Sequence, residues 1–262
     1  MSLDARTISL SGGRTSAFML AELIRRGERR PSDHILFANT GREREETLEF
    51  VRDVAAHWAM PVIWVEWSES GFVEVSFETA SRKGDPFEAL IRKRKIPPNP
   101  VARFCTQELK IRPMKKWMVA HGHDHWTNLV GIRADEPRRS SRIQNSQRKE
   151  RFDVALPLVE WGITIEHVND FWGRQPFNLQ LKQHEGNCDL CFLKQVASRV
   201  QIANERPDLA EWWHRMEQET GGTFRKEGSL KQLIDLAARK KLLADAQGDL
   251  FTCFCGDDVE AA

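Results

Sequence analysis

Thr7-Ile8-Ser9-Leu10-Ser11-Gly12-Gly13-Arg14-Thr15-Ser16 reads as a short buried strand that runs directly into a glycine-bearing turn and then a helix. The two glycines let the backbone approach a phosphate closely, and hydroxyls and free N–H groups at the helix start can hold its oxygens. A short glycine motif is also common in ordinary turns. The position at the end of the first strand favours a phosphate loop, although the stretch matches neither GxxxxGK[ST] nor GxGxxG.

Further apolar runs alternate with helical patterns along the first half of the chain. We expect strands at 7–10, 34–38, 61–65 and 129–132, with amphipathic helices after the first and second. This alternation predicts an α/β fold with a doubly wound, mainly parallel sheet of the Rossmann-like kind. Ligands of such sheets bind beyond the carboxyl ends of the strands, so the site is expected at the strand-to-helix turns.

The chain is expected to divide into a nucleotide-binding α/β domain, 1–155, and a mainly helical C-terminal region, 156–262, that carries cysteine-rich elements. Helices are predicted at 205–220 and 229–246. The long polar stretch between the third and fourth strands is predicted to be an irregular excursion near the site rather than part of the core.

The composition is that of an ordinary globular protein, with 40% hydrophobic and 29% charged residues and a net charge of +1. No apolar run approaches the roughly 18 residues of a membrane span, and the first residues lack a signal-peptide core. We therefore expect a cytoplasmic protein without a membrane partner. Its five cysteines would stay reduced there, which favours metal binding or redox chemistry over disulfides.

Two segments, 92–95 and 138–151, concentrate Lys and Arg. Charge runs are usually solvated surface. The alternative is a surface that binds substrate phosphates or the backbone of a nucleic acid such as tRNA or DNA. The sequence leaves both interpretations open.

The glycine turn resembles the Ser-Gly-Gly-x-Asp-Ser loop of the adenine nucleotide α-hydrolase (PP-loop ATP pyrophosphatase) superfamily, and within it the phosphoadenosine phosphosulfate reductase family. Thr15 stands where many members carry Asp, so no magnesium role transfers to this position, although magnesium could still accompany the nucleotide. The resemblance implies that ATP or another adenylyl nucleotide is bound by Ser9, Ser11, Gly12, Gly13, Arg14, Thr15 and Ser16.

Two further turns resemble segments of the same family. Asn39-Thr40-Gly41 resembles its Asp-Thr-Gly segment, in which Gly41 would open the turn and Thr40 would contact the adenosine. A plain turn capped by Thr40 is the other interpretation. Gly131-Ile132-Arg133 resembles the start of Gly-x-Arg-x-x-Glu, and Arg133 would donate its guanidinium fork to phosphate or sulfate oxygens.

The segment from Arg103 to Pro113 is similar to the family's Cys-x-x-x-[LR]-K-x-x-P motif. The resemblance implies that Cys105, Lys110 and Arg112 face the nucleotide. The positive charges of Arg103, Lys110 and Arg112 are also predicted to lower the pKa of the Cys105 thiol. Together with tryptophan-bearing segments near 156–161 and 168–172, the resemblance extends over residues 7–194.

The remaining cysteines form a C-x-x-C, Cys188 and Cys191, and a C-x-C, Cys253 and Cys255. Thiolates at such spacings bind zinc or an iron–sulfur cluster, and a lone C-x-x-C can be a redox pair. In one arrangement Cys105, Cys188 and Cys191 hold a [4Fe-4S] cluster, with the fourth iron open or bound by a tail cysteine. In the other, the four cysteines of the two pairs hold zinc or a cluster. The first is favoured because Cys105 occupies the motif position of a family cluster ligand.

The function expected from the resemblance is ATP-dependent sulfur transfer. An acceptor oxygen would attack the α-phosphorus of ATP, and sulfur from the cluster or Cys105 would displace the adenylyl group, with Lys110, Arg112 and Arg133 offsetting charge. A nucleic-acid acceptor and a sulfur or electron donor protein would be partners. The alternatives are a sulfonucleotide reductase, in which Cys255 of Cys255-Gly256 would attack the substrate sulfur, and a non-catalytic nucleotide-binding protein with structural zinc.

Overall fold

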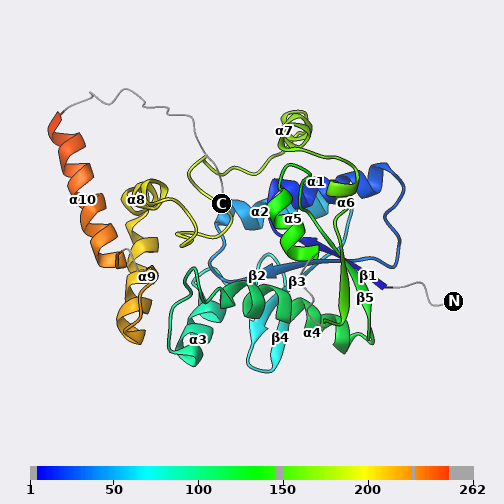
Figure 1. Ribbon diagram of the computed structural model, residues 1–262, viewed down its shortest axis with the longest axis horizontal. Helices are drawn as coiled ribbons and strands as arrows, with labels where there is room; N and C mark the ends of the chain where they lie inside the picture. Colours follow the sequence, from blue (N-terminus) through cyan, green and yellow to red (C-terminus); the bar gives the residue numbers. More distant parts are fainter. Residues whose placement is uncertain (1–4, 145–149, 226–227, 248–262) are drawn as a thin grey trace.

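A six-stranded sheet lies at the centre of the computed structural model, which describes residues 5–144, 150–225 and 228–247 (Figure 1). Its strand order is β4-β3-β2-β1-β5-β6, and every neighbouring pair is parallel except β3 and β4. The strands are β1 Ala5–Leu10, β2 His34–Asn39, β3 Val62–Ser68, β4 Gly71–Val75, β5 Trp126–Val130 and β6 Phe152–Ala155. The predicted doubly wound, mainly parallel sheet is therefore confirmed.

Helices cover both faces of this sheet. In Figure 1, α1, α2 and α7 lie on one side and α3 and α4 on the other, while α8, α9 and α10 gather beyond α3. The helices are α1 Arg14–Arg25, α2 Glu45–His57, α3 Asp85–Arg94, the π-helix η1 Cys105–Ile111, α4 Arg112–Ala120, α5 Pro137–Gln144, α6 Pro157–Glu160, α7 Ile165–Gly173, α8 Val196–Glu205, α9 Pro207–Thr220 and α10 Leu230–Gln247.

The sequence of β2 shows why the sheet lies between two layers of helices. Its run from Ile35 to Ala38 is apolar without alternation and is entirely buried, as expected of a parallel strand covered on both faces. Ile35 and Phe37 join the core under α1 and α2, whereas Leu36 and Ala38 pack with residues of α4. Successive side chains thus supply two different cores.

The polar stretch between β3 and β5 was predicted to be irregular and outside the core, and that prediction is wrong. It contains β4, α3, η1 and α4, and it buries Phe87, Ile91, Trp117 and Met118. The many Lys and Arg residues hid this pattern because a helix needs an apolar residue only every third or fourth position on one face. Three of the four basic residues of 92–95 form the last turn of α3.

The C-terminal helices share a second core with α3 and with the segment around Cys188 and Cys191, called the cysteine segment below. Leu190 and Phe192 of this segment belong to that core. The predicted helix at 205–220 begins later, at Pro207, because proline is favoured in the first turn and disfavours helix at the residue before it. It ends at Gly221, whose φ of +67° is a typical helix C-cap. α7 packs against α1, so the domain boundary at 155/156 stays a prediction.

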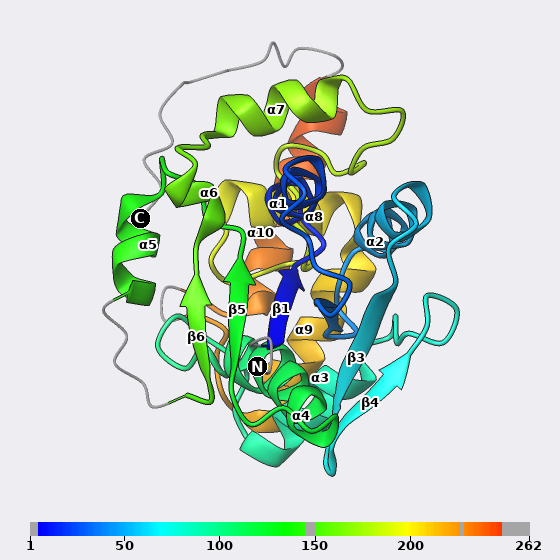
Figure 2. The ribbon, with the colours of Figure 1, turned by 90° about the vertical axis from the view of Figure 1, so that its right-hand side faces the viewer.

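Figure 2 shows the strands side by side, with β6 and β4 at the two edges of the sheet. Along the described ranges of the chain, no helix combines the length and the apolar character that crossing a membrane requires.

We predict that the protein loses stability as the pH falls from about 7.5 to about 5.5. Burial lowers the pKa of His34, and the neighbouring imidazole of His123, 3.0 Å away between the Nε2 atoms, lowers it further. The neutral form is favoured on folding, so this stabilisation is complete above the ordinary pKa of histidine and is lost as the pH falls through the lowered pKa. Thermal unfolding followed by circular dichroism at both pH values should show a smaller pH effect in His34→Gln; an equal effect would contradict the assignment.

Candidate functional site

The strand order places a topological switch point at one edge of the sheet. The chain proceeds from β1 to β2 and β3 in one direction and places β5 and β6 on the other side of β1. Because β1, β2 and β5 are parallel, the loops that follow them meet at the same edge. The reversal between β1 and β5 is where ligands bind in open α/β sheets.

Ser16 organises the predicted phosphate loop. Its hydroxyl donates to the carbonyl of Gly13 at 3.0 Å, accepts from the backbone N–H of Ser11 at 3.0 Å and lies 2.9 Å from the Ser11 hydroxyl. Gly12 has a φ of +77°, and a Cβ there would lie 2.4 Å from the side chain of Thr47. The loop is therefore specific for glycine at this position.

The amino terminus of α1 follows β1 directly and lies at the same edge of the sheet. Within the described residues, no side chain caps this helix at Gly13. Its first-turn N–H groups and its dipole are thus available to an anion. The loop after β5 lies against this turn, since a Cβ on Gly131 would be 2.9 Å from the Ser16 Cα.

Arg133 lies beside the phosphate loop. Its Nη1 is 3.4 Å from the Thr15 hydroxyl, and its Nε donates to Asp135 at 2.8 Å. The Asp135 carboxylate thus orients the guanidinium, which leaves a cation next to the helix start. The structure brings Arg133 and the loop together, and their contact with phosphate stays a prediction.

The turn after β2 is held by buried hydrogen bonds. Asn39 is fully buried; its amide donates to Glu66 at 2.6 Å and its carbonyl accepts from the backbone of Gly41 at 3.1 Å. The Thr40 hydroxyl donates to Glu43 at 3.2 Å. Burial raises the pKa of Glu66 despite these hydrogen bonds. Asn39 and Thr40 therefore shape the turn, and direct contact with adenosine stays a prediction.

The cysteine segment contacts these loops through Asn187, a residue that no sequence motif selected. The Asn187 amide donates to the Ser11 carbonyl at 3.0 Å, and the Asn187 carbonyl accepts from the Arg44 backbone at 2.7 Å. Next to it, Cys188 forms an isolated antiparallel bridge with Glu43. The position of Asn187 beside a C-x-x-C was the only signal in the sequence.

Three half-buried thiols, Cys105, Cys188 and Cys191, lie close enough to influence one another electrostatically. Lys110 lies among them and forms an ion pair with Glu43, with 2.9 Å between Nζ and Oε1. Burial alone would lower the pKa of Lys110, but Glu43 and then Cys188 outweigh it and raise the pKa. Lys110 is therefore a fixed cation next to the cysteines.

The predicted lowering of the Cys105 pKa is wrong. Burial raises the pKa of this thiol, the neighbouring Cys191 raises it further, and Lys110 only partly offsets them. The other two cations are engaged elsewhere: Arg112 donates to Glu108 at 2.6 Å, and Arg103 donates to a backbone carbonyl. Without an additional cation the thiol form of Cys105 is favoured.

A buried ion pair positions the C-x-x-C segment. Asp189 pairs with Arg42 and accepts a hydrogen bond from the Trp213 indole at 2.9 Å. The Arg42 guanidinium stacks 4.4 Å from the centre of the Trp212 ring. Burial raises the pKa of Asp189 to about 6, and Arg42 opposes that shift. The segment is thus tied to both the β2 turn and α9.

The donor set of this site fits a soft metal centre. Three cysteines from two separate segments converge on it, and thiolates are the ligands of iron–sulfur clusters and of zinc. A bound metal would supply the positive charge that favours the thiolate forms. Cys253 and Cys255 lie outside the described residues, so the arrangement that includes them stays a prediction.

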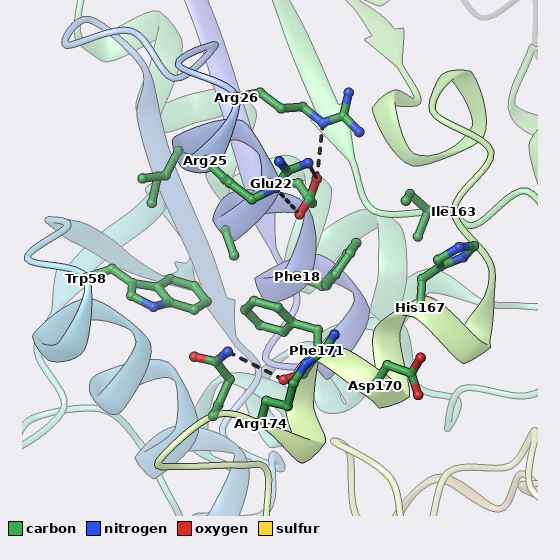
Figure 3. A pocket seen from close by; sticks show the side chains of 13 residues that line it. Phe18, Glu22, Arg25, Arg26, Trp58, Ile163, His167, Asp170, Phe171 and Arg174 are labelled. Atoms are coloured by element: carbon green, nitrogen blue, oxygen red, sulfur yellow. Dashed lines mark hydrogen bonds and ion pairs between the residues drawn. The ribbon is translucent and has the colours of Figure 1, made fainter.

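A cavity of about 550 Å³ lies elsewhere, between α1 and α7 (Figure 3). Phe18, Trp58 and Phe171 form its apolar part, and Glu22 on its wall is bound by Arg25 and Arg26. None of its lining residues belongs to the loops after β1, β2 or β5. It is separate from the candidate site.

The basic segments differ in their surroundings. In 92–95, Arg92 binds Glu219 at 3.0 Å and Arg94 binds Glu108 at 2.5 Å, so both guanidinium groups have internal partners. The segment 138–151 begins in α5, where Arg138 and Arg142 are exposed, and 145–149 lies outside the described residues. Nucleic-acid binding by either segment stays a prediction.

The sheet topology and the glycine loop, together with the family match reported next, define an α/β protein of the adenine nucleotide α-hydrolase superfamily. The chain belongs to the phosphoadenosine phosphosulfate reductase domain family, whose sequence profile matches residues 6–175. Family membership associates it with adenine nucleotides and, in general terms, with nucleotide-dependent sulfur chemistry.

Two relatives share much of the sequence. The chain is 31% identical over 213 residues to the uncharacterised nin region protein ORF290 of Escherichia phage lambda. The aligned region covers 75% of this chain and 68% of the phage protein. It is 24% identical over 190 residues to the uncharacterised protein MJ0066 of Methanocaldococcus jannaschii, which covers 71% of this chain and 36% of the archaeal protein.

Among solved structures, the chain is similar to the U34-tRNA thiolase NcsA from Methanococcus maripaludis with its [4Fe-4S] cluster. The TM-score is 0.44 at 14% identity, and the match covers 97% of this chain and 76% of that one.

Gly131→Ala is predicted to weaken ATP binding by at least about tenfold. The new Cβ would lie 2.9 to 3.3 Å from three backbone atoms of Thr15 and Ser16, which cannot move without shifting the helix start. Gly173→Ala is the matched control, since nothing lies within 4 Å of a Cβ there. Calorimetric titration with ATP measures both; unchanged affinity of folded Gly131→Ala would exclude the start of α1 as the phosphate site.

Proposed function

We propose that this protein is an ATP-dependent sulfur transferase that adenylylates an oxygen of its acceptor and then replaces that oxygen with sulfur. The hydrogen bond between Asn187 and Ser11, at 3.0 Å, is the observation that carries the proposal. It holds the cysteine segment against the phosphate loop, so a sulfur donor and an activated phosphate would share one edge of the sheet.

In the first step, an acceptor oxygen attacks the α-phosphorus. The bond between that phosphorus and the bridging oxygen breaks, and pyrophosphate leaves with the electron pair. The N–H groups at the start of α1 and the guanidinium of Arg133 hold the phosphate oxygens and offset the charge that develops on them. Glycine at 12 and 13 admits the phosphates close to the backbone.

In the second step, hydrosulfide attacks the adenylylated carbon, the carbon–oxygen bond breaks, AMP leaves with the electron pair, and the proton of the hydrosulfide is released. Cys105, Cys188 and Cys191 would hold a [4Fe-4S] cluster, which when bound supplies thiophilic iron to this chemistry. The ammonium of Lys110 stays charged beside the thiols and offsets their negative charge. The buried surroundings of Cys105, among Phe104 and Leu109, limit access of water.

A cluster accounts for the arrangement of the three thiols better than a single zinc ion. In the described ranges, the one group of three metal-binding side chains whose ligand atoms all lie within 4.8 Å is formed by His184, Glu185 and Glu205. One zinc ion needs its ligands gathered in a tetrahedron of that size, whereas each cysteine of a cluster binds a different iron.

The acceptor is proposed to be a nucleic acid, either tRNA or DNA. α5 follows the loop that carries Arg133, and its exposed Arg138 and Arg142 would lie where a polyanionic acceptor approaches this edge of the sheet. A separate protein would restore the sulfur or the electrons after each turnover.

The test is anaerobic incubation of the iron-loaded protein with ATP, sulfide and bulk tRNA or DNA. Pyrophosphate, AMP and thiolated nucleotides should form in equal amounts. Sulfite release from adenylyl sulfate with a thiol, without pyrophosphate from ATP, would replace the proposal with a sulfonucleotide reductase. ATP binding without any turnover would indicate a non-catalytic role.

Arg133→Ala should lower the rate of pyrophosphate release by about 100-fold, because it removes a donor from the departing phosphates. Arg52→Ala is the control: Arg52 is an exposed cation that pairs with its neighbour Asp53 on α2. Initial rates across ATP concentrations measure both. Equal rates in the two variants would remove Arg133 from the site.

Asn187→Ala should separate the two steps. Adenylylation depends on the phosphate loop, whereas sulfur transfer depends on the position of the cysteine segment against it. Pyrophosphate release should therefore exceed thiolation by about tenfold, the effect of losing roughly 1.4 kcal/mol of positioning. Equal yields of both products would show that this hydrogen bond does not align the two halves of the site.

A further inference from the structure

We propose that Glu43 is the fourth protein ligand of the metal centre held by Cys105, Cys188 and Cys191. This inference rests on the proposed metal centre and adds a residue that the sequence motifs do not select. It follows from the position of the Glu43 carboxylate beside Cys188 and from the unequal surroundings of its two oxygens.

Glu43 lies in the loop between β2 and α2, and its side chain is 0% exposed. Its backbone pairs with Cys188 in an isolated antiparallel bridge. A carboxylate that is removed from water is costly unless each oxygen has a partner. A carboxylate in this position, beside a cysteine pair, is therefore expected to have a partner at each oxygen.

The two oxygens of this carboxylate have different surroundings. Oε1 binds the Lys110 ammonium at 2.9 Å and the Thr40 hydroxyl at 3.2 Å. Oε2 is buried and has no hydrogen-bond partner among the described residues. Oε1 thus fixes the orientation of the group, and Oε2 is left with a lone pair for a further cation.

The neighbouring thiol supplies the second part of the argument. Cys188 pairs with Glu43 through the backbone, and directly paired residues of an antiparallel bridge place their side chains on the same face. A thiolate beside this carboxylate would be repelled by its negative charge, and the Lys110 ammonium already binds Oε1 at 2.9 Å. A metal centre between them would remove this conflict, since each group would bind a cation.

Three thiolates and one carboxylate make a set of four ligands, one for each iron of a [4Fe-4S] cluster. The carboxylate is a harder ligand than a thiolate and binds iron–sulfur centres less firmly. The iron bound by Glu43 would then be the one that loses its ligand most readily. One iron of the cluster, the one next to the bridge between Glu43 and Cys188, would therefore differ from the other three in its protein ligand.

The experiment compares full-length variants after anaerobic loading with ferrous iron and sulfide. The wild-type chain should bind about four irons and show the spectrum of a four-iron cluster. Glu43→Gln should lose one iron about tenfold faster under mild oxidation, because the amide is a poor ligand. Glu43→Cys should keep four irons and show a changed electron paramagnetic resonance spectrum, because all four ligands become thiolates.

Glu22→Gln is the matched control, since it also replaces a buried carboxylate, one whose oxygens are bound by Arg25 and Arg26 at the cavity that is separate from the candidate site. It should leave the iron content and the spectrum unchanged. If Glu43→Gln fails to fold by circular dichroism, Glu43→Cys still decides, because a spectrum identical to that of wild type would overturn the proposal.

Two results would count against Glu43 as a ligand. If Glu43→Gln matches wild type in iron content, spectrum and oxidation rate, while Cys253→Ser or Cys255→Ser loses iron, the tail supplies the fourth ligand and the proposal is wrong. If wild type binds no iron, the metal centre of the proposed function falls together with this inference. A wild-type cluster with the expected Glu43 effects but no pyrophosphate release would overturn the sulfur-transferase proposal alone.

Discussion

The contact between the cysteine segment and the loops at the carboxyl edge of the sheet is the constraint on which the candidate site depends. Asn187 contacts the phosphate loop through Ser11 and the β2 turn through Arg44. These hydrogen bonds join residues that are 176 and 143 positions apart in the chain. Without them, the glycine loop and the cysteines would be two separate parts of the molecule.

Buried charges set the geometry of this contact. Three consecutive residues of the β2 turn are buried, and each pairs with a partner from another segment: Arg42 with Asp189, Glu43 with Lys110, and Arg44 with Glu185. Buried ion pairs add little net stability, because desolvation offsets their attraction, but removal of one partner is costly. We infer that these pairs select one arrangement of the turn and the cysteine segment.

The two cores have a corresponding division of roles. The core under α1, α2 and α7 holds the sheet and the start of α1, and the Trp172 indole donates to the carbonyl of Arg14 at 3.0 Å. The second core joins α3, the Cys105 segment and the C-terminal helices. Cys105 and the C-x-x-C segment thus belong to a unit that packs beside the nucleotide-binding sheet, and their loops meet at its edge.

The sequence by itself determined the four central parallel strands, β1, β2, β3 and β5, and the glycine turn after β1. Both features are local patterns. A strand that is buried on both faces needs a continuous apolar run, such as Ile35 to Ala38, and a turn with a positive φ needs glycine, as at 11–16. Family motifs in order along the chain likewise identified the family. The elements between β3 and β5 were missed because charged side chains on outward faces masked a sparse apolar pattern.

Only the tertiary structure decided which groups meet at the site. The pKa of Cys105 was predicted from sequence neighbours, but burial and Cys191 determine it, and Arg112 is bound to Glu108. Asn187 and Glu43 carry no motif that marks them as partners of Ser11 and Cys188. Their roles arise because parallel strands bring their following loops to one edge, where distant segments supply hydrogen bonds and charges that no local pattern can encode.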